Sequence, residues 1–309
     1  MRMLSCLIAA ATLVVGAALL AGAEDAKPAG AAGHPFIGTD NGQGKVFRVS
    51  AAGQIEWEYP ASQGQDVWVL PNGNYLFSHV RGVKEVTPDA EKKVVWEYQS
   101  PDGAEVHNCQ PLPDGSVMVA ECGTARIIEI GRDLALRKEI KIEIKTKGTH
   151  SQIRMARKLP SGNYLLALNG DHLVREYDAE GKVVRSIPVP GDPYGAVRLP
   201  SGNTLISCGD GHTFIEVDPT DKIVWQITEN EIPGHPLRFV AGFQRLPNGN
   251  TVICNWGGHG FIGKQPQIFE ITPDKKVVWQ VEDHKQFKAF AGIQLLDVKG
   301  DVTRGEIVR

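Results

Sequence analysis

A five-residue turn sequence occurs five times in this chain of 309 residues and constrains its fold more than any other feature. The copies begin at Leu70, Leu112, Leu159, Leu199 and Leu246, and each reads Leu-Pro, then Asn, Asp or Ser, then Gly, then Asn or Ser. Proline presets the first corner of a tight turn, and glycine adopts the positive φ that closes it. Because short apolar runs flank each copy, each predicts a β-hairpin, and five copies at intervals of 40 to 47 residues predict a repeat architecture.

A second motif alternates with the first and supplies two further strands. Its six copies span residues 46–59, 83–98, 127–140, 174–187, 214–227 and 268–281. In each copy, a polar turn separates two apolar runs. One unit of both motifs therefore has four strands, which matches the blade of a β-propeller. In four units the fourth strand carries a tryptophan, at positions 57, 96, 225 and 279, where we expect packing between blades.

The numbers of the two motifs predict how the ring closes. The second motif has six copies and the first only five, so one blade lacks its innermost strand. Residues 291–296 (AGIQLL) align with residues 241–246 (AGFQRL) and can supply that strand from the other end of the chain. We therefore predict an all-β fold: one six-bladed β-propeller of four-stranded blades over residues 36–309, with the C-terminal strand joining the first blade.

Residues 1–23 have the pattern of a cleavable signal peptide. Arg2 precedes an apolar stretch over residues 4–20, and the small residues Ala21, Gly22 and Ala23 form a suitable cleavage site. Residues 24–35, rich in Ala, Gly and Pro, are expected to form a flexible lead-in. No cysteine lies at the cleavage point, and no later stretch is apolar enough to span a membrane. We therefore expect a protein of the periplasm or the extracellular space, without a lipid anchor.

Charge and cysteine content narrow the classes of partner and cofactor. The net charge of −3 gives no basic field for a nucleic acid. Cys109, Cys122, Cys208 and Cys254 lack the paired spacing of a zinc site and are expected to be free and buried. The sequence requires no cofactor, and neither a quinone nor a metal is favoured, because a histidine metal site needs several nitrogens around one ion and a sequence does not show such convergence.

The candidate site lies on one face of the predicted propeller. The hairpin turns lie on one face, and the other connections lie on the opposite face, which we call the loop face. The loop-face connections carry eight of the nine histidines, and variable, titratable loops on a uniform scaffold usually carry function. Six positions before each hairpin proline, the innermost strands have Gln65, His107, Arg154, Tyr194 and Ala241, with Ala291 in the closing strand. Polar groups on one wall and small residues on the other predict a pocket at the channel mouth.

Twelve residues are candidates for this pocket. The candidate catalytic residues are His107, His150, His235 and His259, with the nucleophile unassigned. The candidate ligand-binding residues are Asp66, Asn108, Arg154, Tyr194, Asp210, His212, Arg238 and Trp256. We expect His107, His150, Arg154, His235 and Arg238 to point into one cavity, with Trp256 or His259 at its rim. Such cations favour an anion, whose binding should strengthen as histidines gain protons. The alternative for each residue is a solvated side chain or a structural ion pair.

The string HNCQPLPDG at residues 107–115 resembles the His-Asp-x-Gln-x-Leu-Pro-Asn-Gly-Asn signature of bacterial arylsulfate sulfotransferases, which are secreted six-bladed propellers. The pattern Asp-x-x-Gly-Lys-Val-Val at residues 178–184 is also similar to repeats of pyrroloquinoline-quinone-type propellers. This resemblance covers most of the chain after residue 36. It implies sulfuryl transfer between phenols through a histidine nucleophile, with other His and Arg residues holding the sulfate. His107 matches the signature histidine, whereas Asn108 replaces the aspartate.

Three classes of function remain open at this point. The first is a propeller that binds a small anionic molecule on the loop face, and the second is a sulfotransferase-like or lyase-like enzyme that uses histidine. The third is a non-catalytic envelope scaffold or protein-interaction propeller. An enzyme should place two or more histidines around one cavity, whereas a scaffold should have a plugged channel and a large apolar or charged rim. The uneven placement of the histidines favours the first two classes, and the substrate is not identified.

Overall fold

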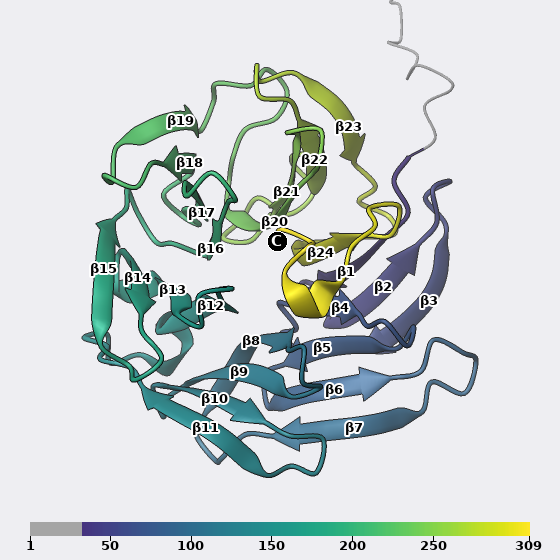
Figure 1. The fold of residues 1–309 in the computed structure, drawn as a ribbon. Helices are drawn as coiled ribbons and strands as arrows, with labels where there is room; N and C mark the ends of the chain where they lie inside the picture. Colours follow the sequence, from purple (N-terminus) through teal and green to yellow (C-terminus); the bar gives the residue numbers. More distant parts are fainter. Residues whose placement is uncertain (1–32) are drawn as a thin grey trace, which may run out of the picture. The chain divides into compact units, whose positions relative to one another are not determined.

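A computed structural model describes residues 33–309, which form six antiparallel four-stranded sheets arranged in a ring (Figure 1). The all-β six-bladed propeller is therefore confirmed. The predicted signal peptide and most of the lead-in lie outside the described residues. Within residues 33–309, no helix is long and apolar enough to cross a membrane. The helical segments described are three short 3-10 turns, η1 (Thr149–Ser151), η2 (Asn169–Asp171) and η3 (Val302–Arg304).

Blades two to six follow the chain, each from its innermost strand at the axis to its outermost strand (Figure 1). Blade two has β4 (Val67–Val69), β5 (Tyr75–His79), β6 (Gly82–Val86) and β7 (Val94–Gln99). Blade three has β8 (Glu105–Pro111), β9 (Val117–Cys122), β10 (Arg126–Ile130) and β11 (Leu136–Lys141). Blade four has β12 (Ile153–Lys158), β13 (Tyr164–Leu168), β14 (Leu173–Tyr177) and β15 (Val183–Pro188). Blade five has β16 (Gly195–Arg198), β17 (Thr204–Ser207), β18 (Phe214–Val217) and β19 (Ile223–Ile227), and blade six has β20 (Val240–Arg245), β21 (Thr251–Asn255), β22 (Ile268–Ile271) and β23 (Val277–Val281).

Blade one combines strands from opposite ends of the described chain. It contains β24 (Phe290–Leu295), β1 (Phe36–Asp40), β2 (Lys45–Val49) and β3 (Ile55–Pro60), in that order from the axis outward. Ile37 lies opposite Gln294, and Thr39 lies opposite Gly292, in an antiparallel register. The predicted closure of the ring by the C-terminal strand is confirmed.

The repeated turn sequence has the predicted role in every copy. In all five turns the glycine N–H donates to the carbonyl of the leucine three residues earlier, with N···O distances of 2.8 to 3.0 Å. The glycines have positive φ, for example 86° at Gly73. In four blades the asparagine after the glycine donates to a glutamate of the third strand, as Asn74 does to Glu85 at 2.6 Å. The polar fifth residue therefore ties the inner hairpin to the outer one.

Apolar side chains fill the spaces between neighbouring blades. Trp57 is buried and lies edge-on to Tyr75 of the next blade, with ring centroids 4.7 Å apart. In blade four, Arg185 takes the equivalent position and pairs with Asp221 of blade five at 2.6 Å. This position therefore contacts the next blade in both cases, through apolar packing at Trp57 and through an ion pair at Arg185. The four cysteines at positions 109, 122, 208 and 254 are free and buried, as expected.

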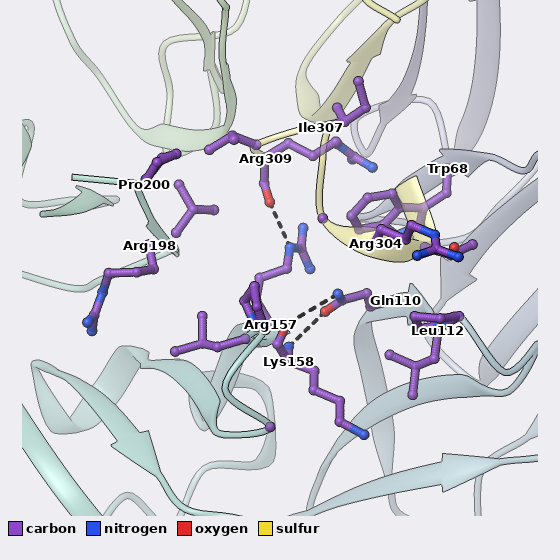
Figure 2. A pocket seen from close by; sticks show the side chains of 18 of the residues that line it. Trp68, Gln110, Leu112, Arg157, Lys158, Arg198, Pro200, Arg304, Ile307 and Arg309 are labelled. Carbon is purple, nitrogen blue, oxygen red and sulfur yellow. Dashed lines mark hydrogen bonds between the residues drawn. The ribbon is translucent and has the colours of Figure 1, made fainter. Parts of the chain in front are cut away.

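The segment after β24 fills the hairpin side of the central channel, and the chain ends at the centre of the ring (Figure 1). The Asp66 carboxylate is buried there between Arg157, at 2.9 Å, and Arg309, at 2.8 Å. Arg157 also donates from Nε to the main-chain oxygen of Arg309, at 2.8 Å (Figure 2). Both guanidinium groups lie over the ring of Trp68. Beside this cluster, a cleft of about 590 Å³ opens between the tail and the turns of blades three to five (Figure 2).

Candidate functional site

A second cavity, of about 630 Å³, lies at the loop-face end of the axis and is lined by residues of all six blades. Six of the twelve candidate residues line it: His150, Arg154, Tyr194, Asp210, Trp256 and His259. The structure thus brings two of the candidate histidines and one arginine together at the predicted place. Glu105, Asp192, Asn169 and Phe239 also line the cavity and were missed by the sequence reasoning.

Two β-bulges insert an extra residue at matched positions of blades three and four. Opposite β9, Val106 pairs with Glu121 and Asn108 with Ala120, which leaves His107 as the extra residue. Opposite β13, Ile153 pairs with Leu168 and Met155 with Ala167, which leaves Arg154 as the extra residue. A bulge turns the side chain of its extra residue away from the regular strand pattern. Arg154 lines the cavity, whereas His107 is fully buried behind it.

Arg154 is the residue of the cavity that most strongly favours the binding of a ligand. Within residues 33–309, its guanidinium has no carboxylate at ion-pair distance, and its buried Nε has no hydrogen-bond acceptor. Burial lowers the pKa of Arg154, while the neighbouring Tyr194, Glu105 and Asp210 raise it. An arginine nevertheless stays charged in proteins. The cavity therefore holds a cation whose hydrogen-bonding capacity is unused.

Glu105 joins two histidines at the wall of the cavity. Its Oε2 lies 3.1 Å from Nε2 of His107 and 2.8 Å from Nδ1 of His150. A proton on the facing ring nitrogen makes either contact a hydrogen bond to Glu105, and such hydrogen bonds lower the pKa of Glu105, the one from His107 more than the one from His150. Burial lowers the pKa of His107 to about 4, although Glu105 opposes that shift. His107 is fully enclosed and His150 is exposed, so only His150 presents its ring to a molecule in the cavity.

The opposite wall is aromatic. The ring of Phe239 lies 4.9 Å from that of Trp256 and 5.7 Å from that of Tyr194, between centroids. Among the described residues, the buried Tyr194 hydroxyl and Trp256 indole N–H have no hydrogen-bond partner. Burial also raises the pKa of Tyr194, so its hydroxyl stays neutral and can donate. At the rim, His259 Nδ1 contacts the Asp210 carboxylate at 2.9 Å.

The other candidates lie away from the cavity, and the expectation that His107, His235 and Arg238 point into it is wrong. His235 contacts Gln280 and packs on Phe269, and Arg238 pairs with Glu229 and stacks on Phe261. Asp66, Asn108 and His212 do not line the cavity either. Asp66 is held by its two arginines, and the Asn108 amide donates to the Arg154 carbonyl at 3.3 Å. For these residues other than His212, contacts that a count along the strand ignores fix the side chains.

Glu105 was within reach of sequence reasoning. It lies two residues before His107, and residues two apart share one side of a regular strand. The bulge at His107, which places the two side chains in different surroundings, corresponds to no recognisable sequence pattern. Asn169 lies in the short turn η2, and Asp192 and Phe239 lie in loops; the conformation of all three depends on tertiary contacts.

The comparisons with known proteins agree with this fold. A protein of unknown function from Bacteroides caccae is 32% identical, with a TM-score of 0.77, and the match covers 84% of this chain and 98% of that one. A catalytically inactive virginiamycin B lyase from Staphylococcus aureus, solved with quinupristin, is 15% identical, with a TM-score of 0.57, over 82% of this chain and 86% of that one. A streptogramin B lyase is also 15% identical, with a TM-score of 0.58, over 85% and 94%. At 15% identity these two lyases share the fold alone.

The family assignment comes from a match of a different kind. No curated protein matches the chain. A family model described as Mal s 1 allergenic protein-like matches residues 45–276, about three quarters of the sequence. The comparisons therefore support this family, and not the arylsulfate sulfotransferases that the turn signature resembles. The chain belongs to the Mal s 1-like family of β-propellers.

Proposed function

We propose that this protein binds a small organic anion in the loop-face cavity. The observation that carries the proposal is the enclosed Arg154 guanidinium, which has no acidic partner among residues 33–309. A carboxylate, phosphate or sulfate group matches the planar fork of a guanidinium and accepts two hydrogen bonds from it. Such a ligand would supply the negative charge that the surrounding chain does not place on Arg154.

The rest of the cavity favours an apolar or aromatic body on that anion. Phe239 and Trp256 provide ring surface. The Tyr194 hydroxyl and the Trp256 N–H, which have no hydrogen-bond partner in residues 33–309, provide neutral donors. The volume of about 630 Å³ is within the usual range for small-molecule sites. Glu105 and Asp210 oppose an anion less than free carboxylates would, because each already contacts a histidine.

The signal-peptide pattern of residues 1–23 supports a periplasmic or extracellular location for this binding. The filled hairpin side of the channel is the feature expected of a scaffold or protein-interaction propeller. The open loop side, where Arg154 has no acidic partner among the described residues, favours the small-molecule ligand over that alternative.

Replacing Arg154 with alanine is expected to weaken binding of sulfate and phenyl sulfate about 10- to 100-fold, since hydrogen bonds to charged groups contribute about 1.5–3 kcal/mol. Calorimetric titration of the wild type and the variant measures this effect. Arg137→Ala is the control, since Arg137 is exposed on the outermost strand β11 of blade three. Equal affinity in wild type and Arg154→Ala would exclude this cavity as the anion site.

A second candidate function, sulfotransferase-like or lyase-like catalysis, is supported by the contact between His150 and Glu105. A carboxylate at Nδ1 orients an imidazole and leaves Nε2 free to act as base or nucleophile, as in many acid–base and covalent catalysts. Arg154 in the same cavity would balance the charge on sulfuryl oxygens. The shared propeller of virginiamycin B lyase adds only that the fold accommodates lyase chemistry.

If His150 is catalytic, nitrophenol release from nitrophenyl sulfate, with phenol as acceptor and a chelator present, should fall at least ~100-fold in His150→Ala. His172→Ala is a matched control, because His172 also pairs with a carboxylate, Asp192 at 2.8 Å, but does not line the cavity. A wild-type protein that releases no nitrophenol, or a His150→Ala variant that keeps the full rate, would reject this candidate while leaving anion binding intact.

A further inference from the structure

Three side chains at the wall of the loop-face cavity converge as metal ligands do. One donor atom from each of Glu105, His107 and His150 lies within 4.8 Å of the other two. We infer that these residues form a binding site for a divalent transition-metal ion such as Zn²⁺. The sequence showed the residue types but not their convergence, which the bulge in β8 and the approach of η1 to β9 bring about.

The orientation of His107 is the second observation that points to a cation. Its Nδ1 lies 3.0 Å from the main-chain oxygen of Ile153, and a carbonyl oxygen only accepts, so Nδ1 carries the proton. In the neutral ring, Nε2 then has a lone pair directed at the Glu105 carboxylate oxygen, 3.1 Å away. A cation between these two acceptors would satisfy both. Histidine ligands of metals typically donate the other ring N–H to a carbonyl or carboxylate in this way.

The dimensions and donor types fit a transition metal. Zinc binds nitrogen and oxygen ligands at about 2.0–2.2 Å, which places two ligands of a tetrahedral ion about 3.4 Å apart. The contacts of Glu105 to His107 and His150, at 3.1 and 2.8 Å, therefore need to lengthen by about 0.3 and about 0.6 Å. Two imidazoles and one carboxylate suit zinc and neighbouring first-row ions, whereas magnesium and calcium prefer oxygen ligands.

The ion would have an open position on the cavity side. The three side chains supply three ligands, and both Glu105 and His150 line the cavity. Three protein ligands with one free position are the arrangement of catalytic rather than structural zinc sites. One part of the inference rests on the proposed function: an anion that Arg154 holds in the cavity could also ligate the ion at its open position. With the ion bound, Glu105 would ligate the metal, so catalysis by a Glu105-oriented His150 applies to the metal-free protein.

Titration of Zn²⁺ alone into the chelator-treated protein tests the site. We expect one ion per chain in the wild type and affinity at least ~10-fold weaker in Glu105→Gln and in His150→Ala. Both residues lie at the cavity wall, so their replacement disturbs the fold less than a change at the fully buried His107. His172→Ala, which breaks a histidine–carboxylate pair without a third ligand, should keep wild-type affinity. Cobalt(II) in place of zinc should give the intense visible absorption of a four- or five-coordinate ion, and the same variants should lose it.

Two results would overturn the inference. Absence of stoichiometric Zn²⁺ binding would show that the cluster is only a histidine–carboxylate contact and not a metal site. Equal affinity in wild type, Glu105→Gln and His150→Ala would place any bound zinc elsewhere. Sulfate titration with a chelator present measures the Arg154 site without the metal, so failure of the metal site and failure of the anion site are separate outcomes. Thermal melts of each variant confirm that a lost site does not reflect a lost fold.

Discussion

Replacing Asp66 with alanine is expected to destabilise the propeller by about 3–5 kcal/mol, the usual cost of removing one partner from a buried ion pair. The Asp66 carboxylate is 3% exposed, and its two oxygens accept from Arg157 at 2.9 Å and from Arg309 at 2.8 Å. Without it, two buried guanidinium groups face each other at the axis with no carboxylate between them. Because total stabilities are about 5–15 kcal/mol, the loss would be a large fraction of the whole. Urea denaturation followed by tryptophan fluorescence measures it.

Two further variants separate the effect of the buried charge on stability from the effect of losing any carboxylate. Asp66→Asn keeps the shape and removes the charge, so it should lose most of the same stability. Asp102→Ala removes a fully exposed carboxylate that pairs with Arg81, and it should change the free energy of unfolding by less than about 0.5 kcal/mol. A loss below about 1 kcal/mol for Asp66→Ala would mean that water or rearranged carbonyls solvate the two arginines, and that the cluster does not stabilise the centre of the ring.

The architecture was predictable because its signals are local and repeated. Each Leu-Pro-x-Gly turn closes on itself through two main-chain hydrogen bonds, from the glycine N–H to the leucine carbonyl and from the leucine N–H to the carbonyl of the fifth residue, so the five-residue string nearly suffices to specify it. Closure followed from the missing sixth hairpin, since the alignment of residues 291–296 with residues 241–246 left a single place for β24. The packing role of the tryptophan in the fourth strand was equally predictable, because that strand faces the next blade in each repeat.

The site was predictable only in position. The loop face and its axial mouth follow from the repeat, and Arg154, His150 and Trp256 lie there as expected. His107 does not, although it is the extra residue of a bulge as Arg154 is: its ring is buried between blades three and four against the main-chain oxygen of Ile153, and Glu105 lies at the wall instead. The direction of a bulged side chain depends on the neighbouring blade, so strand counting does not reveal it.

Asp66 shows the second limit of such reasoning. It lies five residues before a hairpin proline, as Asn108 does, and was therefore a candidate for ligand binding. Its partners Arg157 and Arg309 are 91 and 243 residues away in the sequence, and no local pattern connects them. Pairing across the axis of a ring depends on closure of the whole ring.

Closure itself can be tested through Phe290, the first residue of β24. Phe290→Ala is expected to cost about 3–5 kcal/mol, the range for truncating a buried aromatic residue. The ring is fully buried, 5.6 Å from Phe36 of the adjoining strand β1 and 5.0 Å from Phe287, between centroids. The residue thus packs β24 onto the start of the described chain. Val278→Ala on the outermost strand β23, at a residue that is 52% exposed, should change stability by less than about 0.5 kcal/mol.

Phe243→Ala distinguishes ring closure from ordinary core packing. Phe243 is equally buried, but it lies in β20 of blade six, whose strands are continuous in sequence. We expect a similar loss of stability in both variants but different rates of aggregation. Weakened pairing of β24 with β1 frees two strand edges, so only Phe290→Ala should aggregate faster under conditions in which both variants remain mostly folded. Light scattering at matched stability measures this difference. Equal aggregation rates would mean that β24 is held in the ring chiefly by other contacts, such as those of Ile293 and Leu295, and that Phe290 is simply one more core residue.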